Sequence, residues 1–323
     1  MSSTEAGPTR WVAVDWGTSS LRAVLMDRHG SVLETQSHAR GILTVPPGGF
    51  GEVFETLFGD WMRPEGTFCL ISGMAGSKQG WVEAPYCACP AGLTDIARHM
   101  IDVEPGRIAL VPGMSDQHAP ASPVDGARVE GHAALVIPDV LRGEEVQIFG
   151  AMALTGLRDG LFILPGTHNK WATVRDGRVA GFQTFMTGEF YAMLSQHSIL
   201  ARTLDAGAPL DPVAFMQGVA QADNGAGLLH NAFGARTLAL FDRLPATALA
   251  SYLSGVLIGE ELHVQPFPDK DREVILIGSD ALTERYALAL KARGIAVRLL
   301  GAEATWAGLH ALVVATGRLP HHP

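Results

Sequence analysis

Residues 15–20, Asp-Trp-Gly-Thr-Ser-Ser, form the stretch of this chain with the clearest potential for chemistry. They lie between two apolar runs, as the turn of a β-hairpin would. Gly17 lets the backbone approach a phosphate closely, and the hydroxyls of Thr18 and Ser19 can donate hydrogen bonds to its oxygens. Asp15 can hold a hydrated Mg²⁺ against those phosphates, because Mg²⁺ keeps several waters and takes few carboxylates. The competing interpretation is an ordinary hairpin turn.

A second glycine-threonine turn, Pro-Gly-Thr-His at 165–168, lies near the middle of the chain. It follows an apolar run at 161–164 and precedes strand-like runs at 171–174 and 179–184. Strand, glycine-threonine turn, strand, tight turn and strand repeat the plan of residues 11–37. Two similar halves predict an internal duplication with a cleft between them, where nucleotides commonly bind.

Glu144 and Glu145 are the acidic pair best suited to act as a base. They open a helix expected over 144–154 and follow residues 112–138, a stretch longer than an ordinary loop. Phosphoryl transfer needs a group that orients the attacking hydroxyl and accepts its proton. Adjacent helical residues point about 100° apart, so only one can face the cleft while the other caps the helix N-terminus. We favour Glu144 as the base; the alternative is that both are ordinary first-turn acids.

The apolar patterning predicts a mixed α/β chain that positions these turns at strand ends. Further strands are expected at 11–15, 21–26, 31–37, 67–72, 107–111, 274–277 and 295–299. Further helices are expected at 52–62, 93–100, 187–200, 211–232, 246–263, 281–293 and 303–316.

Length and composition narrow the class of protein. A chain of 323 residues with 47% apolar and 18% charged residues predicts two packed domains. No apolar run is long enough to span a bilayer, and residues 1–10 do not resemble a secretory signal, so we expect no membrane partner. Three cysteines without ligand-like spacing predict a reduced, cytoplasmic protein with no zinc site. The net charge of −9 argues against a nucleic-acid partner.

The two turns resemble the phosphate loops of the superfamily of sugar kinases, actin and heat-shock chaperones. Asp15 to Thr18 match the first loop, and residues 165–168 occupy the place of the second, without its usual acidic residue. Gly278 and Ser279 occupy the place of the adenosine loop, where a glycine lets adenine lie flat on the backbone.

Longer stretches resemble one family, the 2-dehydro-3-deoxygalactonokinases. The Arg-Gly-Glu-Glu segment at 142–145 and the Pro-Gly-Thr-His-Asn-Lys-Trp segment at 165–171 are more specific than the glycine-threonine turns. The matching stretches are 13–22, 73–81 with 84–86, 111–113, 139–147, 164–171, 186–190 and 254–261. The resemblance thus runs over nearly the whole chain, from about residue 11 to residue 316.

This resemblance implies ATP-dependent phosphorylation of the 6-hydroxyl of 2-dehydro-3-deoxy-D-galactonate, in galactonate breakdown of the De Ley–Doudoroff type. It implies two ribonuclease-H-like (actin-like ATPase) domains with a nucleotide cleft between them, and ATP and Mg²⁺ as cofactors. We expect residues 8–154 to bind the sugar acid and carry the first phosphate loop. We expect residues 155–318 to carry the second phosphate loop and the adenosine loop.

The acid substrate needs a partner for its carboxylate. Arg142 offers a fork of two hydrogen bonds, although it can instead contact the transferring phosphoryl group. Lys78 is the other candidate, and its alternative is an ordinary solvated lysine. Gly76 and Ser77 offer donors for the sugar hydroxyls.

The remaining candidates concern the nucleotide. We expect Gly166, Thr167 and His168 to donate to phosphate oxygens. Arg22 and Lys170 either reach phosphates or pair with surface acids.

Three questions stay open at this point. One alternative function is a kinase for another acid sugar, and another is an ATP-driven binding module, because this fold hosts many activities. The choice between galacto and gluco stereochemistry depends on a single hydroxyl contact. A homodimer through the Leu/Ile/Gly face of the helix at 246–263 is the open alternative to a monomer.

Overall fold

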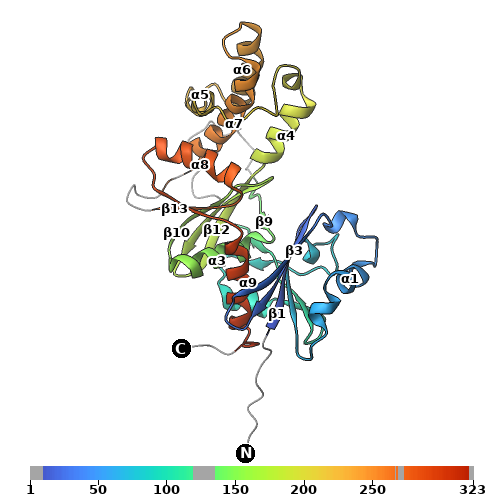
Figure 1. Ribbon diagram of the computed structural model, residues 1–323. Coiled ribbons are helices and arrows are strands. Elements are labelled where there is room, and N and C mark those ends of the chain that lie inside the picture. Colours follow the sequence, from blue (N-terminus) through green and yellow to red (C-terminus); the bar gives the residue numbers. More distant parts are fainter. Residues whose placement is uncertain (1–9, 119–134, 266, 268–272, 320–323) are drawn as a thin grey trace, which may run out of the picture. The chain divides into compact units, whose positions relative to one another are not determined.

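The computed structural model describes residues 10–118, 135–265, 267 and 273–319. The chain packs into two compact units, which Figure 1 shows in sequence colours. The first unit comprises residues 1–159, 172–183 and 302–323, and the second comprises residues 160–171 and 184–301. Relative to the expected division at 154/155, the first unit also includes residues 155–159, residues 172–183 from two neighbouring strands, and residues 302–323 with the C-terminal helix.

A six-stranded sheet forms the first unit. Its order is β3 (Val32–His38), β2 (Leu21–Asp27), β1 (Arg10–Trp16), β4 (Cys69–Gly73), β7 (Ile108–Leu110) and β6 (Ile101–Glu104). β1 pairs antiparallel with β2, as the hairpin pattern predicts, and parallel with β4. This register sets Asp15 beside Ser72 and Trp16 beside Gly73, so the first phosphate turn follows the carboxyl end of the sheet.

Helices cover this sheet and bury its apolar side chains. They are α1 (Phe50–Met62), α2 (Leu93–Arg98), α3 (Glu144–Thr155) and α9 (Glu303–Ala315), with short 3₁₀ turns η1 (Ile42–Thr44) and η2 (Met74–Gly76). α1 contributes Phe54 and Phe58 to a core that includes Trp16. α3 and α9 lie side by side in Figure 1, and a Cβ on Gly150 would lie only 1.7 Å from the carbonyl oxygen of Ala304. A small sheet of β5 (Cys87–Ala88), β8 (Met114–Asp116) and β9 (Asp139–Leu141) completes this part.

The second unit is built on a five-stranded sheet whose strands come from separate parts of the chain. Its order is β12 (Arg178–Phe185), β11 (Asn169–Arg175), β10 (Gly160–Leu164), β13 (Val274–Ile277) and β14 (Val297–Leu300), with residues 172–183 belonging to the first unit. β13 pairs parallel with both β10 and β14. The helices are α4 (Thr187–His197), α5 (Pro212–Ala222), α6 (Leu228–Leu240), α7 (Ala246–His263) and α8 (Asp280–Ala292), with a 3₁₀ turn η3 (Ile199–Arg202).

The structure corrects two sequence predictions in this unit. The single helix expected over 211–232 is two helices, because Asn224 accepts a hydrogen bond from the Ala226 N–H and forms a local turn that competes with the helix. The apolar face of α7, named above as a candidate dimer surface, is buried within the unit, where α7 is covered along most of its length.

Most other predicted elements are confirmed to within a few residues. The stretch 112–138 contains β8, which the glycine- and proline-rich composition hid, and residues 119–134 lie outside the described residues. Within the described ranges, no helix combines the length and the apolarity that crossing a bilayer requires.

Candidate active site

The first phosphate turn is closed by backbone hydrogen bonds. The Gly17 N–H donates to the Ser20 carbonyl at 2.9 Å, and the Ile42 N–H donates to the Gly17 carbonyl at 3.0 Å. The side chains of Thr18 and Ser19 are exposed. The turn therefore has a defined backbone and presents hydroxyl groups that a phosphate can reach.

Asp15, the metal candidate, is paired with Arg22 on the neighbouring strand. Arg22 Nη2 lies 2.5 Å from Asp15 Oδ2, and the side chains are 41% and 18% exposed, respectively. Arg22 was expected either to reach phosphates or to pair with an acid, and the structure shows the pairing with an acid. Among the described residues, no three His, Cys, Asp or Glu side chains gather as a metal cage. Oδ1 of Asp15, which Arg22 does not contact, has the chemistry to hold a Mg²⁺ ion that keeps its waters and binds phosphates.

Two glycines let three segments meet at the end of β4. Gly73 and Gly143 have φ angles of 91° and 103°, which side chains disfavour. A Cβ on Gly73 would lie 2.7 Å from the Trp16 carbonyl oxygen, and one on Gly143 would lie 3.4 Å from the Gly73 Cα. The end of β1, the end of β4 and the start of α3 are therefore in contact at backbone level.

Both glutamates at the start of α3 turn back onto the preceding backbone. Glu144 Oε2 accepts from the Arg142 N–H at 2.9 Å, and Glu145 Oε2 accepts from the Gly143 N–H at 2.7 Å. Glu144 is half-buried, whereas Glu145 is fully buried. Burial, followed by the charge of Glu144, raises the pKa of Glu145 to about 8.

Arg142 carries donors that the protein itself does not use. Its Nη2 donates to the Ala84 carbonyl at 2.8 Å, and its guanidinium lies 4.6 Å from the centre of the Tyr86 ring. Its Nε and Nη1 are buried without a hydrogen-bond partner among the described residues. Gly76 lies directly against this group, because a Cβ there would be 2.9 Å from Nη1.

Three more buried atoms near Arg142 share this condition. The side-chain oxygens Ser72 Oγ, Ser77 Oγ and Glu145 Oε1 also have no partner among the described residues. We call Ser72, Ser77, Arg142 and Glu145 the unpaired cluster. Lys78, the other candidate for the substrate carboxylate, is an exposed loop residue.

A hydrogen bond to the side chain of Asn169 stabilises the backbone of the second phosphate turn. Asn169 Oδ1 accepts from the Gly166 N–H at 2.7 Å, and the Glu189 N–H donates to the Thr167 carbonyl at 2.9 Å. His168 and Thr167 are exposed, and His168 Nε2 lies 2.5 Å from Glu189 Oε2. Lys170 is buried and its Nζ donates to Thr184 Oγ1 at 3.0 Å, so it is not a surface cation.

A pocket of about 210 Å³ lies beside this turn, within the second unit. Gly166 and Asn169 line it from the turn, and α4, α7 and α8 supply the remaining walls. The residues from the helices are Thr187, Gly188, Tyr191, Ser254, Leu257, Ile258, Leu282, Arg285 and Tyr286. Gly278 and Ser279, the expected adenosine loop, are not among the lining residues but directly precede α8.

Glu261 is a buried acid that the sequence argument did not single out. It is 3% exposed and accepts hydrogen bonds from Asn169 Nδ2 at 2.8 Å and from the Tyr286 hydroxyl at 2.7 Å. Thr187 Oγ1 and Trp171 Nε1 also donate to it. Burial raises its pKa, while these donors oppose the shift. An acid in the last turn of an otherwise apolar helix was the available signal.

The fold and its structural relatives identify the class of protein, and the sequence comparisons then identify the family. A structure of a protein classed as a 2-dehydro-3-deoxygalactonokinase from Sinorhizobium meliloti matches with a TM-score of 0.81 and 35% identity, covering 94% of this chain and 98% of that one. Component A of the (R)-2-hydroxyglutaryl-CoA dehydratase of Acidaminococcus fermentans has a TM-score of 0.50 at 12% identity over 97% of this chain and 100% of its own, a likeness of fold alone. The predicted α/β fold of the actin-like ATPase and sugar kinase class is confirmed.

Sequence comparison specifies the family. A family model described as 2-keto-3-deoxy-galactonokinase matches residues 15–312. A probable 2-dehydro-3-deoxygalactonokinase of Rhizobium meliloti (strain 1021) is 36% identical, covering 93% of this chain and 95% of that protein. The 2-dehydro-3-deoxygalactonokinase of Escherichia coli (strain K12) is 30% identical, covering 94% and 97%. The chain belongs to the 2-keto-3-deoxy-galactonokinase family and is a carbohydrate kinase.

Proposed function

We propose that this kinase transfers the γ-phosphoryl group of ATP to the 6-hydroxyl of 2-dehydro-3-deoxy-D-galactonate. The names of the relatives support the substrate class, and the observation that carries the proposal is that the buried Nε and Nη1 of Arg142 have no partner among the described residues. A sugar acid supplies an anion that matches these two buried donors; the alternative use of Arg142, contact with the transferring phosphoryl group, is open to any sugar kinase.

The substrate carboxylate binds Arg142 in this proposal. A buried polar group without a partner costs about 1–3 kcal/mol, more when it is charged. A carboxylate that accepts from Nε or from Nη1 would remove part of this cost, and with the second N–H of Nη2 either group forms a two-bond fork. Ser77 Oγ and the backbone of Gly76 lie in the same segment and would serve the sugar hydroxyls. Lys78 becomes a solvated lysine.

ATP uses the two glycine-threonine turns and the pocket of the second unit. Thr18 and Ser19 donate to phosphate oxygens through exposed groups, and Thr167 and His168 do so from their own turn. Gly17 and Gly166, whose N–H groups are used within the turns, let the phosphates approach the backbone closely. The pocket beside Gly166 takes the adenosine, with Gly278 and Ser279 at its border, because α8 begins there and lines it. Phosphate contacts by Arg22 and Lys170 stay predictions, since both cations are engaged within the protein.

Asp15 is the proposed contact for Mg²⁺, through water. The bound ion would neutralise charge on the phosphates as transfer proceeds. Asp15 offers Oδ1 for this purpose, while Arg22 occupies Oδ2 and competes with the metal ion for the charge of the carboxylate.

Glu144 is the proposed base. The Arg142 N–H orients its carboxylate, and its partial exposure leaves it accessible to a hydroxyl. It accepts the proton of the 6-hydroxyl as the oxygen attacks phosphorus. Glu145 is buried and holds the Gly143 N–H, so it orients the turn rather than touching the sugar.

The cysteines bear on the compartment in which the enzyme works. We propose that it works in the cytoplasm, where ATP is supplied and where the free, buried thiols of Cys69, Cys87 and Cys89 stay reduced. The domain roles expected for 8–154 and 155–318, and a homodimer, stay predictions.

Coupled measurement of ADP release with Mg-ATP tests the proposal. The acceptors are 2-dehydro-3-deoxygalactonate, its gluconate epimer, and none. We expect release that depends on the acceptor and is fastest with the galactonate compound. Equal release without an acceptor would instead identify an ATPase module, and preference for another acid sugar would discard the substrate.

A further inference from the structure

We infer that Glu261 is a positioning residue that shapes the nucleotide pocket and thereby sets the affinity for ATP. The inference rests on the proposed use of this pocket by ATP. It assigns a role to a buried acid that takes no part in the proposed chemistry.

The donors to Glu261 are the walls of the pocket. Asn169, Thr187 and Tyr286 each donate to its carboxylate, and each lines the pocket. They come from β11, α4 and α8, while Glu261 lies on α7. One carboxylate therefore ties together four elements that surround the same cavity.

The link extends to the phosphate turn through one amide. Asn169 donates to Glu261 Oε2 through Nδ2 and accepts from the Gly166 N–H through Oδ1. A rotated amide would lose both bonds, because it would turn its oxygen toward the carboxylate and its nitrogen toward the N–H. Glu261 thus fixes the orientation of Asn169, and Asn169 fixes the backbone of Gly166.

A carboxylate suits this place because it only accepts. Trp171 Nε1 donates to Oε1, and three donors converge on Oε2. Glutamine has one acceptor oxygen and an NH₂ group that must face at least one of these donors. Glu261→Gln keeps the shape and removes the acceptor pattern, so it is the informative substitution.

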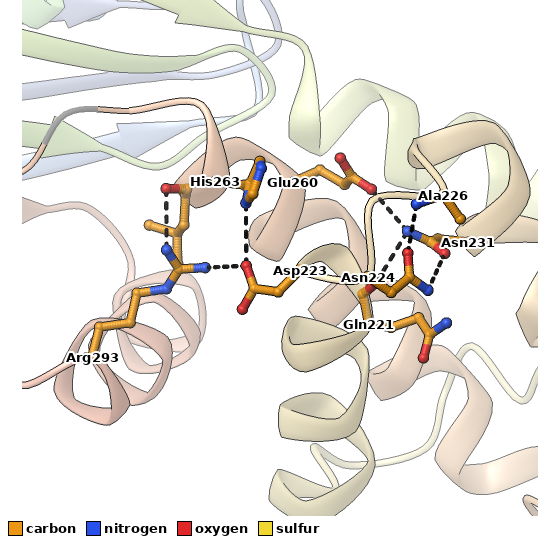
Figure 2. A network of polar contacts seen from close by, with 9 residues as sticks. Gln221, Asp223, Asn224, Ala226, Asn231, Glu260, His263 and Arg293 are labelled. Atoms are coloured by element: carbon orange, nitrogen blue, oxygen red, sulfur yellow. Dashed lines mark hydrogen bonds and ion pairs between the residues drawn. The ribbon is translucent and has the colours of Figure 1, made fainter.

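The neighbouring acid has a different role, which makes it a matched control. Figure 2 shows that Glu260 Oε1 accepts from Asn231, 3.1 Å away, in a polar network of α5, α6 and α7. In the same view, Asp223 joins His263 and Arg293. None of these residues lines the pocket. Glu260→Gln keeps an acceptor for Asn231 and makes the same chemical change one residue away.

The experiment compares the wild type, Glu261→Gln and Glu260→Gln as full-length proteins. ATP binding is measured by calorimetry, and KM is measured separately for ATP and for the sugar acid. We expect Glu261→Gln to weaken ATP binding and raise KM for ATP by about 10-fold or more, with KM for the sugar acid nearly unchanged. Hydrogen exchange of a peptide covering 161–170 should quicken. Glu260→Gln should match the wild type in all these readouts.

Other results overturn the inference. Unchanged ATP affinity in Glu261→Gln, with only a lower melting temperature, would make Glu261 a purely structural residue. If that variant does not fold, Tyr286→Phe and Thr187→Val each remove one donor, and unchanged ATP affinity in both would have the same meaning. Calorimetry needs no turnover, so weaker ATP binding in Glu261→Gln supports the inference even if the sugar acid proves not to be a substrate.

Discussion

Glu145 and Glu261, the two buried glutamates in the described part of the chain, stand in opposite hydrogen-bonding states. Glu145 accepts one backbone N–H on Oε2 and has no partner for Oε1 among the described residues. Glu261 accepts from four side chains through both oxygens. Both carboxyls have raised pKa values because of burial, but only at Glu261 do several side-chain donors oppose the shift.

The contrast separates two uses of buried polar groups. A saturated acid such as Glu261 holds its surroundings in one arrangement and has no capacity left for a ligand. The unpaired cluster around Glu145 and Arg142 carries a cost that the fold alone does not relieve. Such uncompensated groups favour a site where a ligand, or a change of protonation, completes the hydrogen bonding.

The largest expected effect concerns the base. Glu144→Gln should lower kcat by about 10²–10⁴-fold, because the amide cannot accept the proton of the hydroxyl. The matched control is Glu52→Gln, which alters an exposed first-turn acid of α1. Equal kcat values for the two variants would show that Glu144 is an ordinary first-turn acid. The unpaired cluster would then have no catalytic base beside it.

The next effect tests the carboxylate site. Arg142→Met should raise KM for the sugar acid by about 30-fold or more, since loss of one partner of a buried charge pair costs about 2–5 kcal/mol. KM for ATP should change little. Lys78→Met, in the same loop region as Gly76, should leave both values near those of the wild type. If Lys78→Met raised KM for the sugar acid and Arg142→Met did not, Lys78 would be the residue that binds the substrate carboxylate.

A stability measurement addresses Glu145 itself. Its pKa of about 8 lies above its ordinary value of 4.5, so between these values the folded state holds a proton that the unfolded state has released. Folding stability therefore falls as pH rises through this window, by up to about 1.4 kcal/mol per pH unit. Glu145→Gln has no such proton, so its stability should gain on the wild type from pH 4.5 to 8. A stability difference between the two proteins that stays constant with pH would show that folding does not raise the pKa of Glu145.

The smallest effect is expected at the phosphate turn of the first unit. Arg22→Met breaks a partly exposed ion pair and should change the unfolding free energy by less than about 1 kcal/mol. The half-saturating Mg²⁺ concentration should fall, because Asp15 loses its competing cation. An unchanged Mg²⁺ dependence would remove Asp15 from the proposed metal contact.

Sequence patterning predicted most elements and the phosphate turns, because apolar periodicity and glycine placement are local properties. The split between α5 and α6 escaped it, because the apolar periodicity on both sides outweighed a local turn signal, the Asp-Asn-Gly run at 223–225. The placement of α9 in the first unit depends on packing between residues more than 140 positions apart, such as Gly150 and Ala304.

The site was predictable in part for the same reason. Candidate side chains followed from residue type and motif, whereas their partners did not. That Arg22 engages Asp15, that Lys170 is buried and that Glu261 gathers four donors all depend on register and tertiary contacts. No spacing rule along the chain contains this information.

The packing of α9 on α3 also bears on how the chain is made. α9 begins at Glu303, whereas the helix that it covers begins at Glu144. During synthesis the first unit therefore lacks one of its covering helices until the second unit, residues 160–171 and 184–301, has left the ribosome. The surface of α3 around Gly150 stays uncovered for that interval, so the first unit completes its fold only after the second unit has been made.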